Sequence, residues 1–502
     1  MKKLTSGQQV KYGAILSYLG IATYILIGLL YTPWMIKVIG KDDYGLYTLA
    51  YSIISLFVFD FGISAAIQRF VAKYLAEKNQ EKVDNCVSIV YKLYIYIDIA
   101  VLSILSIIFF FIPIIYTELT IDQLNRLKIV YLMAGLFSVL SFPFIPLNGI
   151  LSAHEKFIQL KTCDLISKVL TVIINIICLS FGGGLYELVA TNIIVGLLIT
   201  LVKFTIVRRE TKIKINLGYS DHQEMKLILS FSGWTTVVAL CQRTIFNIAP
   251  SILGMFAGAS VIAVFGIAVS LEAYTFAFAS ALNGLFLPKI SRILNDTGDV
   301  LPLMIRVGRI QILTIGLIII GFITVGSDFI SCWLGDGYEE AYVCTLLFII
   351  PAFFLLPADI ADQTLIASGN VKFRAMVYIV MAVANVILSY FMTKYWGCIG
   401  LASSICIAYM IRNVLLYYVY YKKLDINIFE FLKESYGKML VGLLLSLIIS
   451  LAICHIIELN GWLNVIVEVL IVTTCYIICM ATLAMNKSEK HLFNIIRKIC
   501  RV

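Results

Sequence analysis

The feature that most constrains this sequence is a series of fourteen long apolar stretches separated by short polar turns. A helix needs roughly 20 mainly apolar residues to cross a bilayer. Inside lipid every backbone N–H and C=O must be paired within its own segment, which favours helices. The pattern therefore predicts an all-α polytopic membrane protein with about 14 transmembrane helices. The predicted spans lie near residues 14–36, 43–65, 88–112, 128–151, 163–182, 185–206, 228–254, 259–285, 308–331, 342–366, 374–394, 397–420, 437–457 and 462–484.

Composition supports a membrane body without a soluble catalytic domain. Apolar residues make up 61% of the 502 residues and charged residues 14%, far from the balance of a soluble domain. The longest polar segment, near 207–227, is too short to fold by itself. We therefore expect a protein that is not an enzyme and that has no cofactor. The sequence contains no phosphate-binding loop of the type GxxxxGK[ST] and no Cys or His pattern typical of a metal site.

The basic residues predict the orientation. The apolar run that follows Lys11 continues to Ile36, too long for a signal peptide, so we interpret it as the first span. Most of the 39 Lys and Arg residues then fall on the side of the N-terminus, which predicts cytoplasmic termini. Contact with anionic lipid accounts for the net charge of +9 better than nucleic-acid binding does. Five residues fall on the outer side, namely Lys37, Lys41, Arg126, Lys128 and Lys394.

Two pairs of similar segments indicate an internal duplication. Residues 149–157 and 365–373 share Ile, Ser, Lys and Phe, and residues 44–47 resemble 265–268 at a similar offset. We predict two six-helix lobes, residues 1–210 and 211–424, followed by two additional helices in 425–502. An even number of spans per lobe makes the repeat parallel, and transporters of that kind bind substrate where the halves meet. A central cavity between the lobes is expected.

Several of these segments carry a family resemblance. Tyr44-Gly45-Leu46-Tyr47, Asp60-Phe61-Gly62-Ile63, Arg69-Phe70 and Ser152-Ala153-His154-Glu155-Lys156-Phe157 resemble motifs of bacterial polysaccharide export proteins. The sequence is similar to the O-antigen flippase-like branch of the multidrug/oligosaccharidyl-lipid/polysaccharide exporter superfamily. The resemblance implies a flippase in the bacterial inner membrane, active in lipopolysaccharide or other polysaccharide biosynthesis. Its substrate would be an undecaprenyl-diphosphate-linked oligosaccharide, moved from the inner to the outer leaflet by alternating access.

Two other functions stay open at this point. A drug/cation antiporter of the same superfamily would normally have 12 spans and depend on a membrane acid. A membrane-bound polysaccharide polymerase would need catalytic groups on large outer loops, whereas the outer turns here are short. The expected partners are the lipid-linked oligosaccharide and membrane lipid, together with other polysaccharide assembly proteins and no nucleic acid.

Arg243 is the most prominent candidate for binding substrate. A charge in mid-membrane is costly and usually faces protein or a water-filled path, and a guanidinium fork suits phosphate oxygens. Glu272 lies at nearly the same predicted depth on the next span. In one interpretation Arg243 binds the diphosphate and Glu272 holds or releases it. In the other, the two residues form a permanent structural ion pair.

The remaining candidates are polar residues within or beside spans. Gln242 and Asn247 could add contacts around Arg243. The family resemblance implies an acidic residue at the position of Asn247, so the neutral side chain argues against ion coupling there. Asp60 and Arg69 could line the inner mouth, or Asp60 could serve as a cap within its lobe.

The ion-coupling candidates are Asp98, Asp359 and Asp362. The last two lie close to Pro351 and Pro357, in a predicted hinge that matches Pro143 and Pro146 of the first lobe. Three further features are the snorkelling Lys92, the outer residues Glu468 and His455 facing water, and Cys332 and Cys344, either bridged or free.

Overall fold

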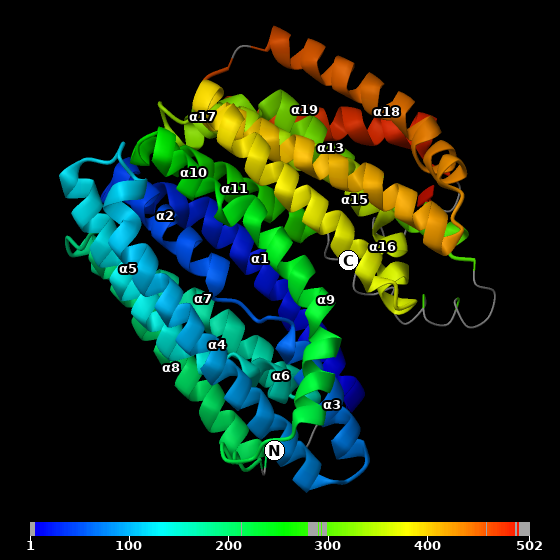
Figure 1. Ribbon diagram of the computed structural model, residues 1–502. Coiled ribbons are helices and arrows are strands. Elements are labelled where there is room, and N and C mark those ends of the chain that lie inside the picture. The colour runs from blue at the N-terminus through cyan, green and yellow to red at the C-terminus, as the bar shows by residue number, and fades with distance from the viewer. Residues whose placement is uncertain are drawn as a thin grey trace. The chain divides into compact units, whose positions relative to one another are not determined.

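The computed structural model describes residues 6–211, 213–279, 290, 293, 299–457, 459–486 and 489–490. Throughout these ranges the regular secondary structure is helical (Figure 1). Twelve helices in the described part of the chain are long and apolar enough to cross a membrane. The prediction of an all-α polytopic membrane protein is therefore confirmed.

Two broken segments reconcile these twelve helices with fourteen predicted spans. The helix α17 (Val371–Leu424) has 54 residues, but Gly397 inside it has φ 55° and ψ −132°, so the segment consists of two helices. These correspond to the predicted spans 374–394 and 397–420. The predicted span 43–65 is divided into α2 (Lys41–Phe57) and α3 (Ile63–Ala76), each too short to be counted alone.

The chain divides into two compact units. The first contains Met1–Gly266 and Ser389–Gly397, and the second contains Ile267–Leu388 and Cys398–Val502. The predicted lobes, residues 1–210 and 211–424, were defined by a sequence repeat, whereas the two units are defined by compactness. The division into lobes therefore stays a prediction.

Helix α1 of the first unit packs along α7, α2 along α5, and α9 against both α2 and α3. Aromatic and branched side chains of α3, α4 and α6 form its main core, with Tyr94 and Phe142 fully buried. The helices are α1 (Ser6–Ile39), α2, α3, α4 (Gln80–Ile115), α5 (Ile121–Ser141), η1 (Phe142–Phe144), α6 (Pro146–Ala153), α7 (Phe157–Ser180), α8 (Leu185–Glu210), α9 (His222–Asn247), α10 (Ala249–Phe256) and the start of α11 (Ala259–Ala279).

Two glycines of the first unit allow unusually close helix contacts. A Cβ added at Gly45 would lie 1.9 Å from the carbonyl oxygen of Ala259, and one at Gly149 would lie 2.7 Å from that of Ser64. A larger residue would force the backbones apart at both places. These contacts explain why glycine occurs at positions 45 and 149, where α2 crosses α11 and α6 crosses α3.

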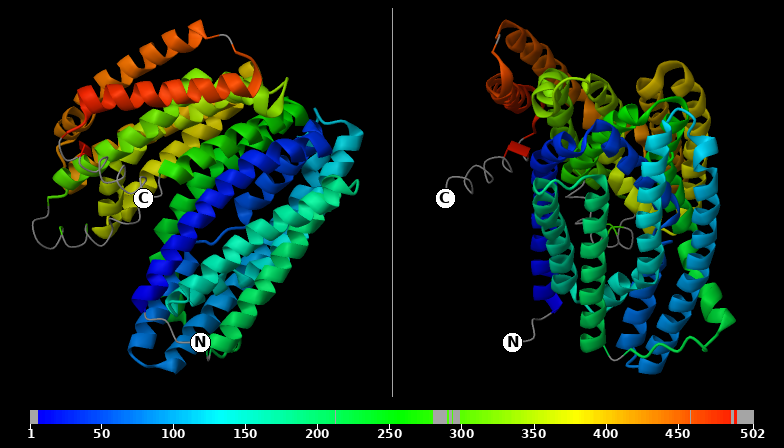
Figure 2. Two further views of the ribbon diagram at one scale, coloured as in Figure 1. Left: turned by 180° about the vertical axis from the view of Figure 1, so that it is seen from behind. Right: turned by 90° about the vertical axis from the view of Figure 1, so that its left-hand side faces the viewer.

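In the second unit, α13 (Leu301–Leu334) packs against both helices of the C-terminal hairpin, α18 (Ile428–Ile456) and α19 (Gly461–Cys479) (Figure 2). Gly316 of α13 faces Leu443, and the Tyr476 hydroxyl donates to the Leu313 carbonyl at 2.8 Å. The unit also contains α14 (Glu339–Ile349), α15 (Ala352–Leu355), η3 (Leu356–Ala358), α16 (Asp359–Ala367), most of α17, and η4 (Met480–Ala484) at the end of α19.

Proline interrupts the two segments in which a hinge is predicted. In the first unit α5 gives way to η1 and then to α6, which begins at Pro146. In the second unit α14, α15, η3 and α16 follow one another around Pro351 and Pro357. Proline lacks the N–H that continues a helix, which accounts for the interruptions. Whether these segments move stays a prediction.

Candidate functional site

The candidate site in the first unit is built on the break between α2 and α3. Residues 58–62 are not helical, and Gly62 adopts a left-handed conformation with φ 68°. Such a break leaves backbone carbonyls without their helical partners, and at membrane depth these must be paired by protein or by water. Two side chains on α9 pair with carbonyls at this break, since Arg243 donates to the Ser55 carbonyl at 2.9 Å and Thr236 donates to that of Phe61.

Arg243 keeps most of its hydrogen-bonding capacity. It is half-buried, and its guanidinium carbon lies 5.0 Å from the centre of the Phe59 ring. A guanidinium has five N–H donors, and among the described residues the Ser55 carbonyl is its one hydrogen-bond acceptor. The remaining donors can therefore bind an anion.

Asp60 sits at the centre of the same break and caps α3. Its Oδ1 atom accepts from the Ser64 amide at 3.0 Å and from the Tyr94 hydroxyl at 2.6 Å. The carboxylate also attracts Arg243 electrostatically. No direct ion pair joins Asp60 and Arg243 in the described part of the chain. This geometry favours the capping interpretation of Asp60 over direct contact with substrate.

The other candidates of the first unit lie around α9, α3 and α4. Gln242 is exposed, Asn247 is the half-buried last residue of α9, and Arg69 is exposed on α3. Asp98 of α4 has a buried Oδ1 atom with no hydrogen-bond partner among the described residues. The proposed roles of these four residues in binding or ion coupling stay predictions.

The start of α9 and the last turn of α3 are joined by a side-chain contact. The Tyr74 hydroxyl donates to Glu224 Oε1 at 3.3 Å, and burial raises the pKa of the Glu224 carboxyl. This contact fixes the start of α9, the helix that carries Arg243.

In the second unit, Glu272 of α11 is attracted electrostatically to Arg412, although no ion pair joins the two among the described residues. Arg412 is 4% exposed, lies 4.3 Å from the ring centre of Tyr409, and donates to the Asn413 side chain at 3.1 and 3.3 Å. Sequence reasoning misses Arg412, because an arginine in the last third of a predicted span is typical of a membrane boundary. Its position within the apolar segment 397–420 was the available signal. The pairing of Arg243 with Glu272 stays a prediction, since the two belong to different compact units.

The two acids of α16 differ in their surroundings. Asp362 is buried and paired with Arg374, whose Nε lies 2.9 and 3.1 Å from the two carboxylate oxygens. Asp359 Oδ2 is buried without a hydrogen-bond partner in the described residues. Asp359 therefore resembles Asp98 in having an unpaired oxygen, whereas Asp362 is already neutralised. Their role in ion coupling stays a prediction.

The cysteines of the second unit that the structure describes are free thiols. Cys332 and Cys344 are not bridged, and Cys344 Sγ lies instead 3.5 Å from Cys398 Sγ. No group of three or more His, Cys, Asp or Glu side chains able to hold a metal occurs within the described ranges.

The fold and the charged positions inside apolar helices define a multi-pass membrane protein with the architecture of known transporters. The solved structure titled "Lipid II flippase MurJ, inward closed conformation" matches with a TM-score of 0.67 and 16% identity, covering 95% of this chain and 98% of that one. A multidrug resistance MATE family transporter of the MOP superfamily, in an inward-facing conformation, matches with a TM-score of 0.66 and 13% identity over 82% and 98%.

Sequence comparison gives the family. The profile of the family described as "Polysaccharide biosynthesis protein" matches residues 10–294, more than half of the chain. This protein therefore belongs to the polysaccharide biosynthesis protein family, as the resemblance predicted. It is also 22% identical over 416 residues to the "Putative O-antigen transporter" of Shigella flexneri, which covers 80% of this chain and 95% of the relative.

Proposed function

We propose that this protein is a flippase that moves an undecaprenyl-diphosphate-linked oligosaccharide from the inner to the outer leaflet of the bacterial plasma membrane. The observation that carries the proposal is Arg243, a guanidinium within an apolar segment whose remaining donors have no partner among the described residues. A diphosphate offers the paired oxygen acceptors that such a fork binds best. Family membership and the names of the transporter and flippase relatives support the same substrate class.

The direction follows from charge. Moving one charge through 100 mV is worth about 2.3 kcal/mol, so two negative charges leaving a negative interior gain roughly 4.6 kcal/mol per 100 mV. The membrane potential can therefore help to drive outward transport, in line with a sequence that lacks a phosphate-binding loop for ATP. Cytoplasmic termini, alternating access and contacts with other assembly proteins are parts of this proposal that the basic-residue pattern and the family support.

A drug/cation antiporter is the second candidate. The similarity to the MATE fold and the unpaired acid oxygens of Asp98 and Asp359 favour it. A polymerase is disfavoured because the outer turn between α4 and α5 comprises only residues 116–120. A flippase and an antiporter transport different substrates, so identification of the transported substrate distinguishes the two functions.

Deletion of the gene tests the proposal in the cell. We expect the deletion strain to lose surface polysaccharide and to accumulate the lipid-linked oligosaccharide in the inner leaflet, because glycan assembly continues while its export stops. Mass spectrometry of extracted lipids and a surface-glycan blot measure the two effects, and a plasmid copy of the gene should reverse both. Unchanged surface polysaccharide combined with a new sensitivity to cationic drugs would contradict the flippase and support the antiporter.

A further inference from the structure

A polar cluster joins the C-terminal hairpin of the second unit to α13. Asn464 of α19 donates through Nδ2 to Asp328 Oδ2 of α13 at 2.8 Å. Glu468 lies one helical turn after Asn464, on the same face of α19, and interacts electrostatically with Asp328. Two carboxyl groups and one amide from two helices thus come together within this unit.

Two oxygens of the cluster are buried and unpaired. Glu468 is 4% exposed and Asn464 is 8% exposed. Glu468 Oε2 and Asn464 Oδ1 have no hydrogen-bond partner among the described residues. The prediction that Glu468 faces water is wrong, because Glu468 shares the face of α19 on which Val465 and Val472 are buried. Buried polar atoms nearly always have a partner, so the cluster lacks one.

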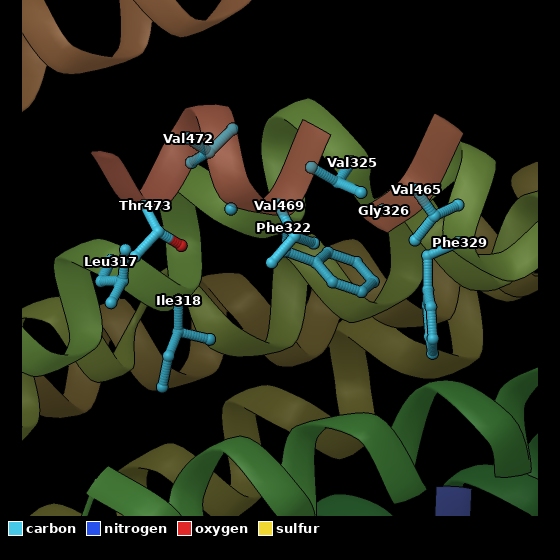
Figure 3. Close-up of a pocket in the computed structure, with 11 residues that line it drawn as sticks. Leu317, Ile318, Phe322, Val325, Gly326, Phe329, Val465, Val469, Val472 and Thr473 are labelled. Atoms are coloured by element: carbon cyan, nitrogen blue, oxygen red, sulfur yellow. The ribbon is translucent and has the colours of Figure 1, made fainter. Parts of the chain in front are cut away.

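Nothing described around the cluster compensates its charge. No Lys, Arg or His of the described residues forms an ion pair with Asp328 or Glu468, and the other titratable group that interacts with both is the Cys454 thiol of α18. Along the same α13–α19 interface lies a cavity of about 260 Å³ (Figure 3). Apart from Thr473 its lining is apolar, with Phe322 and Phe329 among the side chains. The two carboxyl groups carry like charges and repel each other.

We propose that Asp328, Asn464 and Glu468 form a binding site for one divalent cation, with Ca²⁺ as the ion that suits them best. Two carboxylates balance two positive charges, and carboxylate and amide oxygens are the ligands of hard cations. Asp328 is exposed, so the ion can enter from solvent and keep waters on that side. Ca²⁺ accepts bidentate carboxylates and irregular geometry, whereas Mg²⁺ retains waters for which Glu468 and Asn464 are too deeply buried. The bound ion would fasten α19 to α13.

Thermal unfolding of the purified full-length protein in detergent tests this site. A ligand that binds only the folded state raises the melting temperature in a saturable way. We expect CaCl₂ to raise the Tm by several degrees over protein in EDTA, and NaCl at equal ionic strength to leave it unchanged. Glu468→Gln should abolish the Ca²⁺ effect. Glu340→Gln, the same substitution at an exposed glutamate of α14, should retain it.

A second variant keeps the test decisive if Glu468→Gln folds poorly. Asp328→Asn changes an exposed side chain, and it should likewise lose the Ca²⁺-dependent shift and the heat of Ca²⁺ binding in isothermal titration calorimetry. An equal shift in wild type and in both variants would overturn the proposal. A wild-type Tm that ignores Ca²⁺ but rises on mild acidification would also overturn it, because a shared proton would then compensate the two carboxyl groups.

Discussion

Replacement of Arg243 by alanine is expected to abolish export of surface polysaccharide while the protein still inserts into the membrane. Two charge-assisted hydrogen bonds to a diphosphate are worth about 3 kcal/mol or more, which corresponds to a loss of roughly a hundredfold or more in transport. Arg243→Lys should retain part of the activity, because it keeps the charge and loses the planar fork. Quantitative blotting of surface glycan, normalised to membrane-inserted protein, measures the effect.

The contact between Arg243 and the Ser55 carbonyl calls for a control that separates binding from structure. Arg243→Gln keeps an N–H donor for that carbonyl but removes the charge, so it should fold normally and still fail to export. Arg306→Ala removes an exposed arginine of α13 and should leave export intact. Normal export by a well-folded Arg243→Gln protein would show that the guanidinium holds the α2–α3 break and does not bind substrate.

Replacement of Arg309 by alanine is expected to be the most destabilising change in the second unit. Arg309 is 5% exposed, and its guanidinium is satisfied by the C-terminal segment and α18. It contacts both carboxylate oxygens of Glu489 at 2.6 and 3.1 Å, the Glu434 carbonyl at 2.9 Å and the Ala484 carbonyl at 2.8 Å. Removing one partner of a buried ion pair costs about 3–5 kcal/mol, because the other charge is left unpaired.

Thermal unfolding and limited proteolysis measure this effect. We expect Arg309→Ala to lower the Tm by several degrees and to make the segment around Ala484 accessible to protease. Arg306→Ala, one turn earlier on α13 and exposed, is the matched control and should do neither. Glu489→Ala should resemble Arg309→Ala, and the double variant should be less destabilised than the sum of the two. Additive losses would contradict a direct pair.

The apolar segments allowed the fold to be predicted, whereas the surroundings of single side chains could not be. The length of an apolar segment is a local property, so the segments could be identified from the sequence. Pro146, Pro351 and Pro357 indicated where helices are interrupted. The break at residues 58–62 was not predicted as such, because its carbonyls are paired by side chains of α9, far along the chain.

The errors concern charged residues whose surroundings are formed by other helices. Arg309 and Arg412 look like ordinary cytoplasmic residues, and long-range packing buries both. Glu468 shares one face of α19 with Asn464, but the sequence does not indicate what packs against that face. Arg243 stands out in the sequence because it lies far from either end of its span, and its role stays a prediction. Depth along a helix can be counted from the sequence, but the direction in which a side chain points depends on the neighbouring helices.

Translocation in reconstituted vesicles tests the central claim most directly. The purified protein is placed in liposomes that contain the undecaprenyl-diphosphate-linked oligosaccharide in both leaflets, and a glycan-cleaving enzyme is added outside. We predict that nearly all of the oligosaccharide becomes cleavable with the wild-type protein, and only the share already facing outward with Arg243→Gln. Cleavage limited to the outward-facing share with the wild-type protein as well would contradict the flippase account.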